Sequence, residues 1–272
     1  METMETPTTK PKVYIHLIRH AHAECNYDPT TATQAEKQAC ESILDPGLTP
    51  HGYDEALHLR HQFPYMKDLT YIFTSPLNRA LLTTIKAFQP AMSAGIKPIV
   101  LPELREAGRG PTSTGYDRHG ILNGVGPCAV HFNTDMLEEG WEVNTAGKGE
   151  SVARAHKVRC MLEELADVLM SQDPDPKPRK LKLWKDFAVS PLKNGKDVHI
   201  AVVSHGDILR KIAGKPPDFD KGPFHNAEFR TYMFRGMNER GPLADGQKTS
   251  DLVQSEKSLV VKIPVDAGGG CG

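Results

Sequence analysis

The sequence predicts a three-layer α/β/α sandwich built around a mostly parallel sheet. Short apolar runs, typical of buried parallel strands, alternate along the chain with longer segments whose apolar residues repeat at helical spacing. This alternation places helices on both faces of one sheet. The predicted strands are residues 13–18, 70–74, 98–101 and 198–203, with 229–234 and 258–263 as late antiparallel edge strands.

A capping residue followed by proline marks the predicted start of two helices. The pairs Thr49-Pro50 and Ser75-Pro76 provide this signal. We expect Ser75 and Ser204 to act mainly as helix caps. The predicted helices are residues 50–61, 77–88, 152–169 and 208–213.

The predicted strands and helices are expected to form one domain over residues 13–264, between disordered tails at 1–12 and 265–272. Residues 107–149 are rich in glycine and proline and have weak periodicity. This stretch is too long for a simple connection, so we expect a lid or specificity insertion. Residues 173–180 (DPDPKPRK) are predicted to be a mobile surface loop.

Composition narrows the class of protein. The formal net charge of −1 gives no overall attraction to nucleic acid or to an anionic membrane, so neither is expected as a partner. No apolar run is long enough to span a bilayer, and residues 1–12 lack a signal core. The five cysteines never form C-x-x-C and are expected to be free thiols in the cytoplasm: Cys25, Cys40, Cys128, Cys160 and Cys271.

Polar side chains follow the predicted parallel strands, where active sites of such sheets lie. Arg19 and His20 follow the first strand, Arg79 the second, Glu106 the third and His205 the last. Arginines bind phosphate through several donors and keep a nearby imidazole unprotonated by like-charge repulsion. The set therefore suits phosphoryl transfer, with a histidine nucleophile, a second histidine donating to the phosphoryl group and a carboxyl acid.

The same residues carry a family resemblance. Residues 17–26 (LIRHAHAECN) resemble the R-H-G-x-x-x-x-N signature of the histidine phosphatase superfamily, in its phosphoglycerate-mutase-like branch. Six further segments are similar to motifs of that family and follow its order: 48–52 (LTPHG), 74–80 (TSPLNRA), 104–106 (LRE), 149–151 (GES), 202–206 (VVSHG) and 226–230 (NAEFR). Together they extend from about residue 13 to about residue 235.

The resemblance implies a phosphoglycerate-mutase-like fold and hydrolysis of a small phosphorylated metabolite, a phosphate monoester, without a metal or other cofactor. It also assigns roles: a phosphohistidine at His20, an acid at Glu106, and phosphate contacts from Arg19, Asn26, Arg79 and His205. Glu103 remains an alternative to Glu106, because it lies three residues away.

The chain departs from the family next to the nucleophile. Ala21 replaces the usual glycine, and His22 replaces the usual glutamate or glutamine. We expect His22 and Gly206 as possible substrate contacts.

Several alternatives remain open. One is a mutase that returns the phosphoryl group to another position of a sugar acid. Others are a binding protein with little turnover and an enzyme using the pocket for other acid–base chemistry. The sequence H-x-H at residues 20–22 is similar to the metal ligands of amidohydrolases, but that fold needs many more βα units, and Arg19 would disfavour a cation there. Oligomeric state and the identity of the substrate are not predicted.

Overall fold

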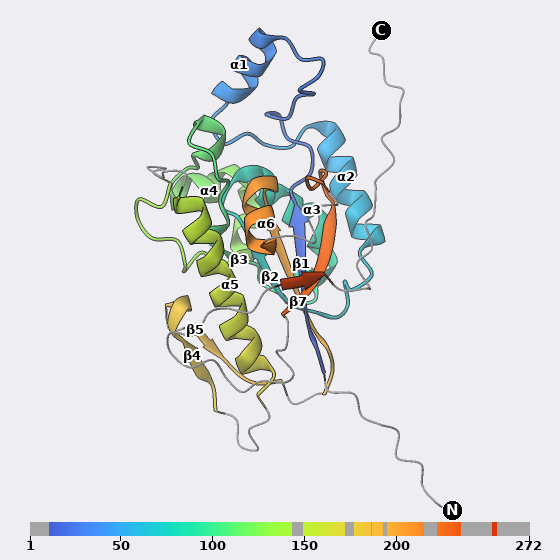
Figure 1. The fold of residues 1–272 in the computed structure, drawn as a ribbon, viewed down its shortest axis with the longest axis vertical. Helices are drawn as coiled ribbons and strands as arrows, with labels where there is room; N and C mark the ends of the chain where they lie inside the picture. Colours follow the sequence, from blue (N-terminus) through green and yellow to red (C-terminus); the bar gives the residue numbers. More distant parts are fainter. Residues whose placement is uncertain are drawn as a thin grey trace, which may run out of the picture.

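A computed structural model describes residues 11–142, 149–171, 177–185, 187–192, 195–214, 222–234 and 252–254. Its centre is a six-stranded sheet in the order β3-β2-β6-β1-β7-β8 (Figure 1). The strands of this sheet are β1 (Val13–Arg19), β2 (Leu69–Thr74), β3 (Ile99–Val100), β6 (Val198–Ser204), β7 (Phe229–Phe234) and β8 (Leu252–Gln254).

The predicted mostly parallel sheet is confirmed. Strands β3, β2, β6 and β1 run parallel to one another, whereas β7 pairs antiparallel with both β1 and β8. Strand β6 lies between β1 and β2, with Arg19 opposite Ser204 and Thr74 opposite Val203. The carboxyl ends of these three strands therefore meet at one edge of the sheet.

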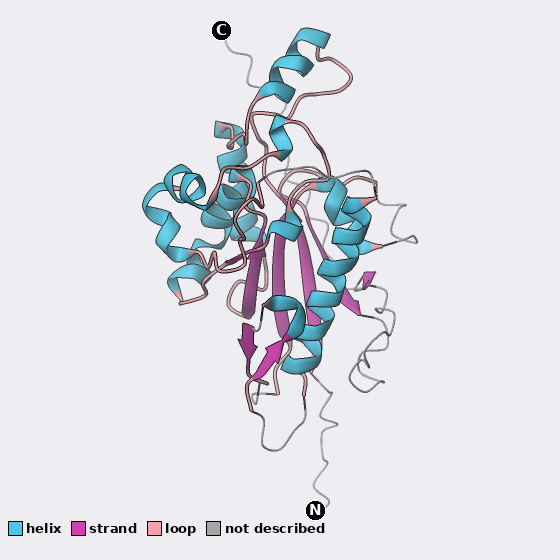
Figure 2. Cartoon of the chain, turned by 90° about the vertical axis from the view of Figure 1, so that its left-hand side faces the viewer, coloured by secondary structure: helices cyan, strands magenta, loops and turns pink. Residues whose placement is uncertain are grey.

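Helices cover both faces of the sheet, as expected for three layers (Figure 2). Side chains alternate between the two faces of a strand. Ile15 and Leu17 of β1 pack with helices α5 (Glu150–Leu169) and α6 (Gly206–Ala213). Ile18 of β1 and Val203 of β6 pack with α2 (Pro50–Gln62) and α3 (Asn78–Ser93).

The N-termini of α2 and α3 are capped differently. Thr49 caps α2 as predicted, since its side chain accepts a hydrogen bond from the Gly52 N–H. Ser75 does not cap α3, so that prediction is wrong: the helix begins after Leu77, and the carboxylate of Asp45, far away in sequence, accepts from the Asn78 N–H. Helix α3 also continues through Pro90 to Ser93, beyond the predicted end at residue 88.

The loop predicted at residues 173–180 is partly wrong. Strand β4 (Arg179–Leu181) pairs with β5 (Phe187–Val189) in a separate two-stranded sheet, joined in part by the 3-10 helix η4 (Lys182–Trp184). Trp184 is buried and donates from Nε1 to the Met161 carbonyl of α5. Tertiary packing therefore overrides the turn-forming local composition.

Residues 107–142 of the expected insertion fold as short helices: η2 (Pro111–Ser113), α4 (Arg118–Gly124) and η3 (Gly126–His131), following η1 (Pro102–Leu104). Phe132 and Trp141 share an apolar cluster with Leu81 of α3 and Val100 of β3. This stretch is thus packed against the elements that carry the predicted site residues.

One further α-helix and one further β-strand were not predicted. Helix α1 (Gln34–Ser42) has no buried residue and lies beyond the sheet at the top of Figure 1. It lacks an apolar face, although Thr33 and Glu36 form a capping box at its start. The other is β8.

The strand predicted at 258–263, the tail 265–272 and most of the tail 1–12 lie outside the described residues. No helix in the described ranges is long and apolar enough to cross a membrane.

Candidate active site

The two motif histidines lie side by side where β1 and β6 end. His20 follows β1 directly, and its backbone N–H donates to the Ser204 carbonyl of β6 at 2.9 Å. His205 is the next residue along from Ser204. The two rings are buried, with their centroids 5.1 Å apart. Parallel pairing of β1 with β6 is therefore what joins two residues separated by most of the chain.

The ring of His20 is held in a defined orientation. Its Nδ1 lies 2.7 Å from the Ala21 carbonyl oxygen, which can only accept, so Nδ1 carries the proton. Nε2 faces the Nε–H of Arg79 at 3.3 Å, and only an unprotonated nitrogen accepts that hydrogen bond. Burial, together with the guanidinium groups of Arg79 and Arg19, lowers the pKa of His20 well below its usual range. At neutral pH, Nε2 therefore presents a lone pair.

His205 is oriented by Ser75, which follows β2. Its Nε2 lies 2.7 Å from the Ser75 hydroxyl oxygen, and that oxygen also accepts from the Leu77 N–H at 3.3 Å. When the hydroxyl donates to Nε2, the proton of the imidazole lies on Nδ1. This Nδ1 is buried and has no hydrogen-bond partner among the described residues. Ser75 thus orients a histidine where the sequence suggested a cap.

Ser204, the other predicted cap, also has a different role. Its hydroxyl donates to the Leu104 carbonyl at 2.6 Å, which ties β6 to the segment carrying Glu106.

Arg79 lies in the first turn of α3 and is 2% exposed. Besides the contact with His20, its Nη1 donates to the Thr112 carbonyl at 2.7 Å. Thr112 belongs to the insertion expected at residues 107–149. The insertion therefore helps to fix the guanidinium that faces the nucleophile.

Arg19, the last residue of β1, donates from Nη1 to the Phe224 carbonyl at 2.7 Å. Its Nε is buried and has no partner in the described part of the chain. A Cβ added to Gly206 would lie 3.6 Å from this nitrogen, so the start of α6 packs closely on Arg19. Arg19 Nε and His205 Nδ1 thus both lack a hydrogen-bond partner within the described ranges, and donors at these two positions suit a buried anion.

The structure separates the two carboxylates considered for the acid. Glu103 forms an ion pair with Lys157 of α5, at 2.6 Å between Nζ and Oε1. Glu106 instead accepts from the Ala107 N–H at 2.7 Å and lies in the electrostatic field of Arg79 and Arg19. Burial raises the pKa of the Glu106 carboxyl above its usual range, which favours a proton donor near neutral pH.

A buried arginine of α5 supports the segment that carries Glu106. Arg154 donates to the carbonyl oxygens of Glu103 and Glu106 at 3.2 Å and 3.1 Å, and to that of Arg105. Glu150, one turn earlier, accepts from Arg154 at 2.9 Å and pairs with Arg105 at 3.3 Å. The G-E-S motif therefore connects α5 to the acid.

His22 lies at the rim of the site and is half-buried. Its Nδ1 is 3.0 Å from the Thr49 hydroxyl, and its backbone N–H donates to Glu55 at 2.6 Å. Burial and the nearby His51 and Arg19 lower the pKa of His22. The motif L-T-x-x-G holds this corner, since a Cβ on Gly52 would lie 2.0 Å from the His22 carbonyl oxygen.

Asn26 closes the loop that follows the nucleophile. Its side-chain oxygen accepts from the Ala23 N–H at 2.9 Å and from the Asn226 amide at 3.1 Å. Asn226 also donates to the His20 carbonyl at 3.2 Å. Only the amide nitrogen of Asn26 remains for a ligand. The described residues contain no group of three or more metal-ligating side chains.

Comparison with known proteins identifies the family. The profile of the histidine phosphatase superfamily (branch 1) matches residues 15–161, which is more than half of the chain. The chain belongs to the histidine phosphatase superfamily. It is accordingly assigned as a phosphatase, and the predicted family and its phosphoglycerate-mutase-like fold are confirmed.

Several solved structures are similar to this chain, and mycobacterial hydrolase 2 supports its fold. Mycobacterial hydrolase 2 is 16% identical, with 95% of each chain covered and a TM-score of 0.51. A mycobacterial glucosyl-3-phosphoglycerate phosphatase is 16% identical over 89% of this chain and 96% of its own, with a TM-score of 0.47. A phosphoserine phosphatase of Entamoeba histolytica, in complex with 3-phosphoglyceric acid, is 19% identical over 89% and 95%, with a TM-score of 0.45. At these identities the likeness concerns the fold alone, and no curated protein matches the sequence.

The structure brings together the predicted site residues Arg19, His20, Arg79, Glu106 and His205, with Gly206 packed beside Arg19. It adds Ser75, Arg154 and Glu150, whose contacts depend on the tertiary fold. The motif matches at 74–80 and 149–151 were the available signals for Ser75 and Glu150, but the motifs did not specify what each side chain contacts, and no motif contained Arg154.

Proposed function

We propose that this chain hydrolyses a small phosphate monoester through a phosphohistidine at Nε2 of His20. The observation that carries the proposal is the short contact between His20 Nδ1 and the Ala21 carbonyl, 2.7 Å, which puts the proton on Nδ1 and leaves Nε2 as a nucleophile. Family membership supports the reaction class.

In the first step, Nε2 attacks phosphorus and the ester P–O bond breaks. Glu106, whose pKa is raised by burial, gives its proton to the leaving oxygen, and an alcohol departs. The proposal gives Arg79, Arg19 and the His205 imidazole the role of holding the phosphoryl oxygens. This role is supported by the closeness of Arg79 and His205 to His20, and by the Arg19 and His205 nitrogens that lack a partner among the described residues. Asn26 provides a further amide donor.

In the second step, water attacks the phosphohistidine. The Glu106 carboxylate takes a proton from the water, the N–P bond breaks, and inorganic phosphate leaves. The carboxyl and Nε2 are thereby restored. The chain supplies a nucleophile, cations and an acid from its own side chains, so the proposal requires no metal.

The substrate is proposed to be a small phosphorylated metabolite. The nucleophile is buried at the sheet edge, with the exposed fraction of His20 only 3%, which favours a compact ester. His22 and Gly206 are proposed to contact the part of the substrate beyond the phosphate. His22 suits this role because the Thr49 hydroxyl contacts its Nδ1 at 3.0 Å, which leaves Nε2 as the ring nitrogen for the substrate.

A panel of phosphate esters, assayed with and without a chelator, tests this proposal. We expect hydrolysis of p-nitrophenyl phosphate and of at least one small metabolite ester, unchanged by the chelator and abolished in His20→Ala. Activity that disappears with the chelator, or that survives in His20→Ala, would refute the mechanism. Transfer of the phosphoryl group to a second position of a sugar acid, in place of release as phosphate, would identify a mutase.

A further inference from the structure

Residues 222–230, which contact Arg19, contain a second set of buried charges, those of Glu228 and Arg230. The backbone of this segment is joined to the nucleophile loop. The Arg19 N–H donates to the Glu228 carbonyl at 3.0 Å, and the Ala227 N–H donates to the His20 carbonyl at 3.2 Å. Ala227 has a φ of 54°, a left-handed conformation that is costly for alanine and needs support from its surroundings.

The side chains of Glu228 and Arg230 form a buried ion pair, 2.6 Å between Oε1 and Nε, with exposed fractions of 2% and 3%. The second carboxylate oxygen accepts from the His225 N–H at 2.6 Å. The guanidinium also donates to the carbonyl oxygens of Gly222, at 3.3 Å, and Pro223, at 3.1 Å. Together the two side chains bind the backbone of residues 222–225 at three points.

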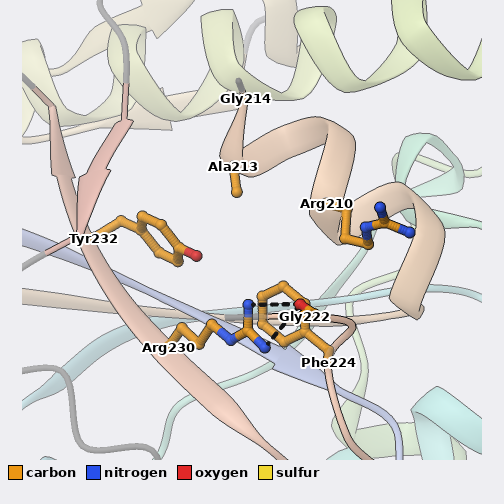
Figure 3. A pocket seen from close by; sticks show the side chains of 7 residues that line it. All are labelled: Arg210, Ala213, Gly214, Gly222, Phe224, Arg230 and Tyr232. Carbon is orange, nitrogen blue, oxygen red and sulfur yellow. Dashed lines mark hydrogen bonds between the residues drawn. The ribbon is translucent and has the colours of Figure 1, made fainter. Parts of the chain in front are cut away.

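The guanidinium of Arg230 also stacks on an aromatic ring. It lies over the ring of Phe224, 4.1 Å from the centroid (Figure 3). These residues line a pocket together with Tyr232 of the same strand and Arg210 of α6. The ring of Phe224 is thus fixed on the pocket side, while its carbonyl oxygen accepts the 2.7 Å hydrogen bond from Arg19 Nη1 on the other.

A contribution to stability does not explain this arrangement well. Removing two charges from water costs about as much as their attraction returns, and an apolar pair of the same volume is often as stable. What an ion pair adds here is geometry. Arginine offers a planar fork with several donors and a face for stacking, which lysine and apolar side chains lack.

We propose that Glu228 and Arg230 are positioning residues for Arg19. They hold residues 222–225 so that the Phe224 carbonyl takes one N–H of Arg19 and directs the rest of its guanidinium toward the phosphoryl group. This inference rests on the proposed function to the extent that Arg19 binds phosphate. It predicts that a change at Arg230 weakens phosphate binding without touching the ligand.

A double-mutant cycle tests the inference. Inorganic phosphate is titrated by calorimetry into wild type, Arg230→Lys, Arg19→Met and the double variant. We expect Arg230→Lys to raise the dissociation constant of phosphate about tenfold, the scale of one misplaced charge-assisted hydrogen bond. Because Arg230 acts through Arg19, adding Arg230→Lys to Arg19→Met should change the constant no further.

The matched control is Arg60→Lys. Arg60 donates from Nε to the Lys86 carbonyl at 2.6 Å, in a part-buried contact between α2 and α3. It should leave phosphate binding unchanged, whatever it does to the melting temperature. If Arg230→Lys does not fold, Phe224→Leu replaces it, since leucine keeps the carbonyl but removes the ring under the guanidinium.

The outcomes separate the two proposals. Unchanged phosphate binding in Arg230→Lys or Phe224→Leu, or additive losses in the double variant, would overturn the positioning role. A wild type that binds phosphate but hydrolyses no ester would refute the proposed function. The double-mutant cycle would still test the positioning role, because it measures phosphate binding alone. A wild type that binds no phosphate would remove the site on which both depend.

Discussion

Asp45 provides a quantitative test of the electrostatics around α3. Its side chain is 3% exposed, and one carboxylate oxygen accepts from the Asn78 N–H at 2.9 Å, at the start of the helix that carries Arg79. The other oxygen is buried without a partner among the described residues. Burial raises the pKa of Asp45 from 3.8 to about 7, against the opposing effects of Asn78 and Arg79.

The perturbation is Asp45→Asn. Asparagine keeps the acceptor for Asn78, carries no charge and tolerates the left-handed conformation of this residue, whose φ is 42°. In the unfolded wild type the carboxyl ionises near 3.8, whereas in the folded state it stays protonated until about pH 7. The wild type therefore loses stability as pH rises through this window, and the variant does not.

The shift of roughly three pKa units corresponds to about 4 kcal/mol above pH 7. About two of these pKa units lie above pH 5. From pH 5 to pH 8 the free energy of unfolding of Asp45→Asn should thus rise by roughly 2 to 3 kcal/mol relative to wild type.

Urea denaturation followed by tryptophan fluorescence measures this difference at pH 5 and pH 8. Asp28→Asn is the control, because the exposed Asp28 carboxylate accepts from the Thr30 N–H at 2.8 Å and the pKa of Asp28 is lowered by these hydrogen bonds. Its cost should be the same at both pH values. A difference between Asp45→Asn and wild type that is also equal at both would refute the reasoning.

Three further predictions concern the site and the core. Arg79→Ala should reduce kcat/KM about a hundredfold, as loss of a preorganised donor does, and a loss below about threefold in steady-state assays would remove Arg79 from the phosphate site. Glu106→Gln should slow hydrolysis of alkyl phosphates much more than that of p-nitrophenyl phosphate, because the p-nitrophenolate leaving group needs no acid. Glu103→Gln should slow neither substrate selectively, and the reverse pattern would make Glu103 the acid. Burial and the neighbouring His199 lower the pKa of His16 well below its usual range, so the free energy of unfolding of wild type should fall relative to that of His16→Gln as pH drops below 6.5, where the unfolded wild type takes up the proton; a difference between the two proteins that stays flat in urea denaturation from pH 7.5 to 5.5 would contradict this.

Most of the sheet could be predicted from sequence because its strands are short apolar runs buried on both faces. Strands β1 and β6 have this pattern, and each ends at a motif histidine. Strand β4 could not be predicted in this way. Its first two residues, Arg179 and Lys180, are exposed, and it exists through pairing with β5 and packing on α5.

Site residues could be predicted from sequence where a chemically distinctive side chain closely follows a predicted strand. His20, Arg79 and His205 are of this kind. The supporting contacts were not, because they join distant segments: Ser75 orients His205, Asp45 caps α3, and Arg154 holds the Glu106 segment. Such contacts depend on the topology of the sheet, which local sequence patterns do not encode.

The central claim is that Nε2 of His20 accepts the phosphoryl group. Wild type mixed with a phosphate ester, quenched in alkaline detergent within the first turnover and digested, should yield one peptide bearing an acid-labile phosphoryl group on His20. The same peptide from His20→Ala should carry none. Turnover without phosphorylation of His20, or with the phosphoryl group on His205 or another residue, would contradict the account.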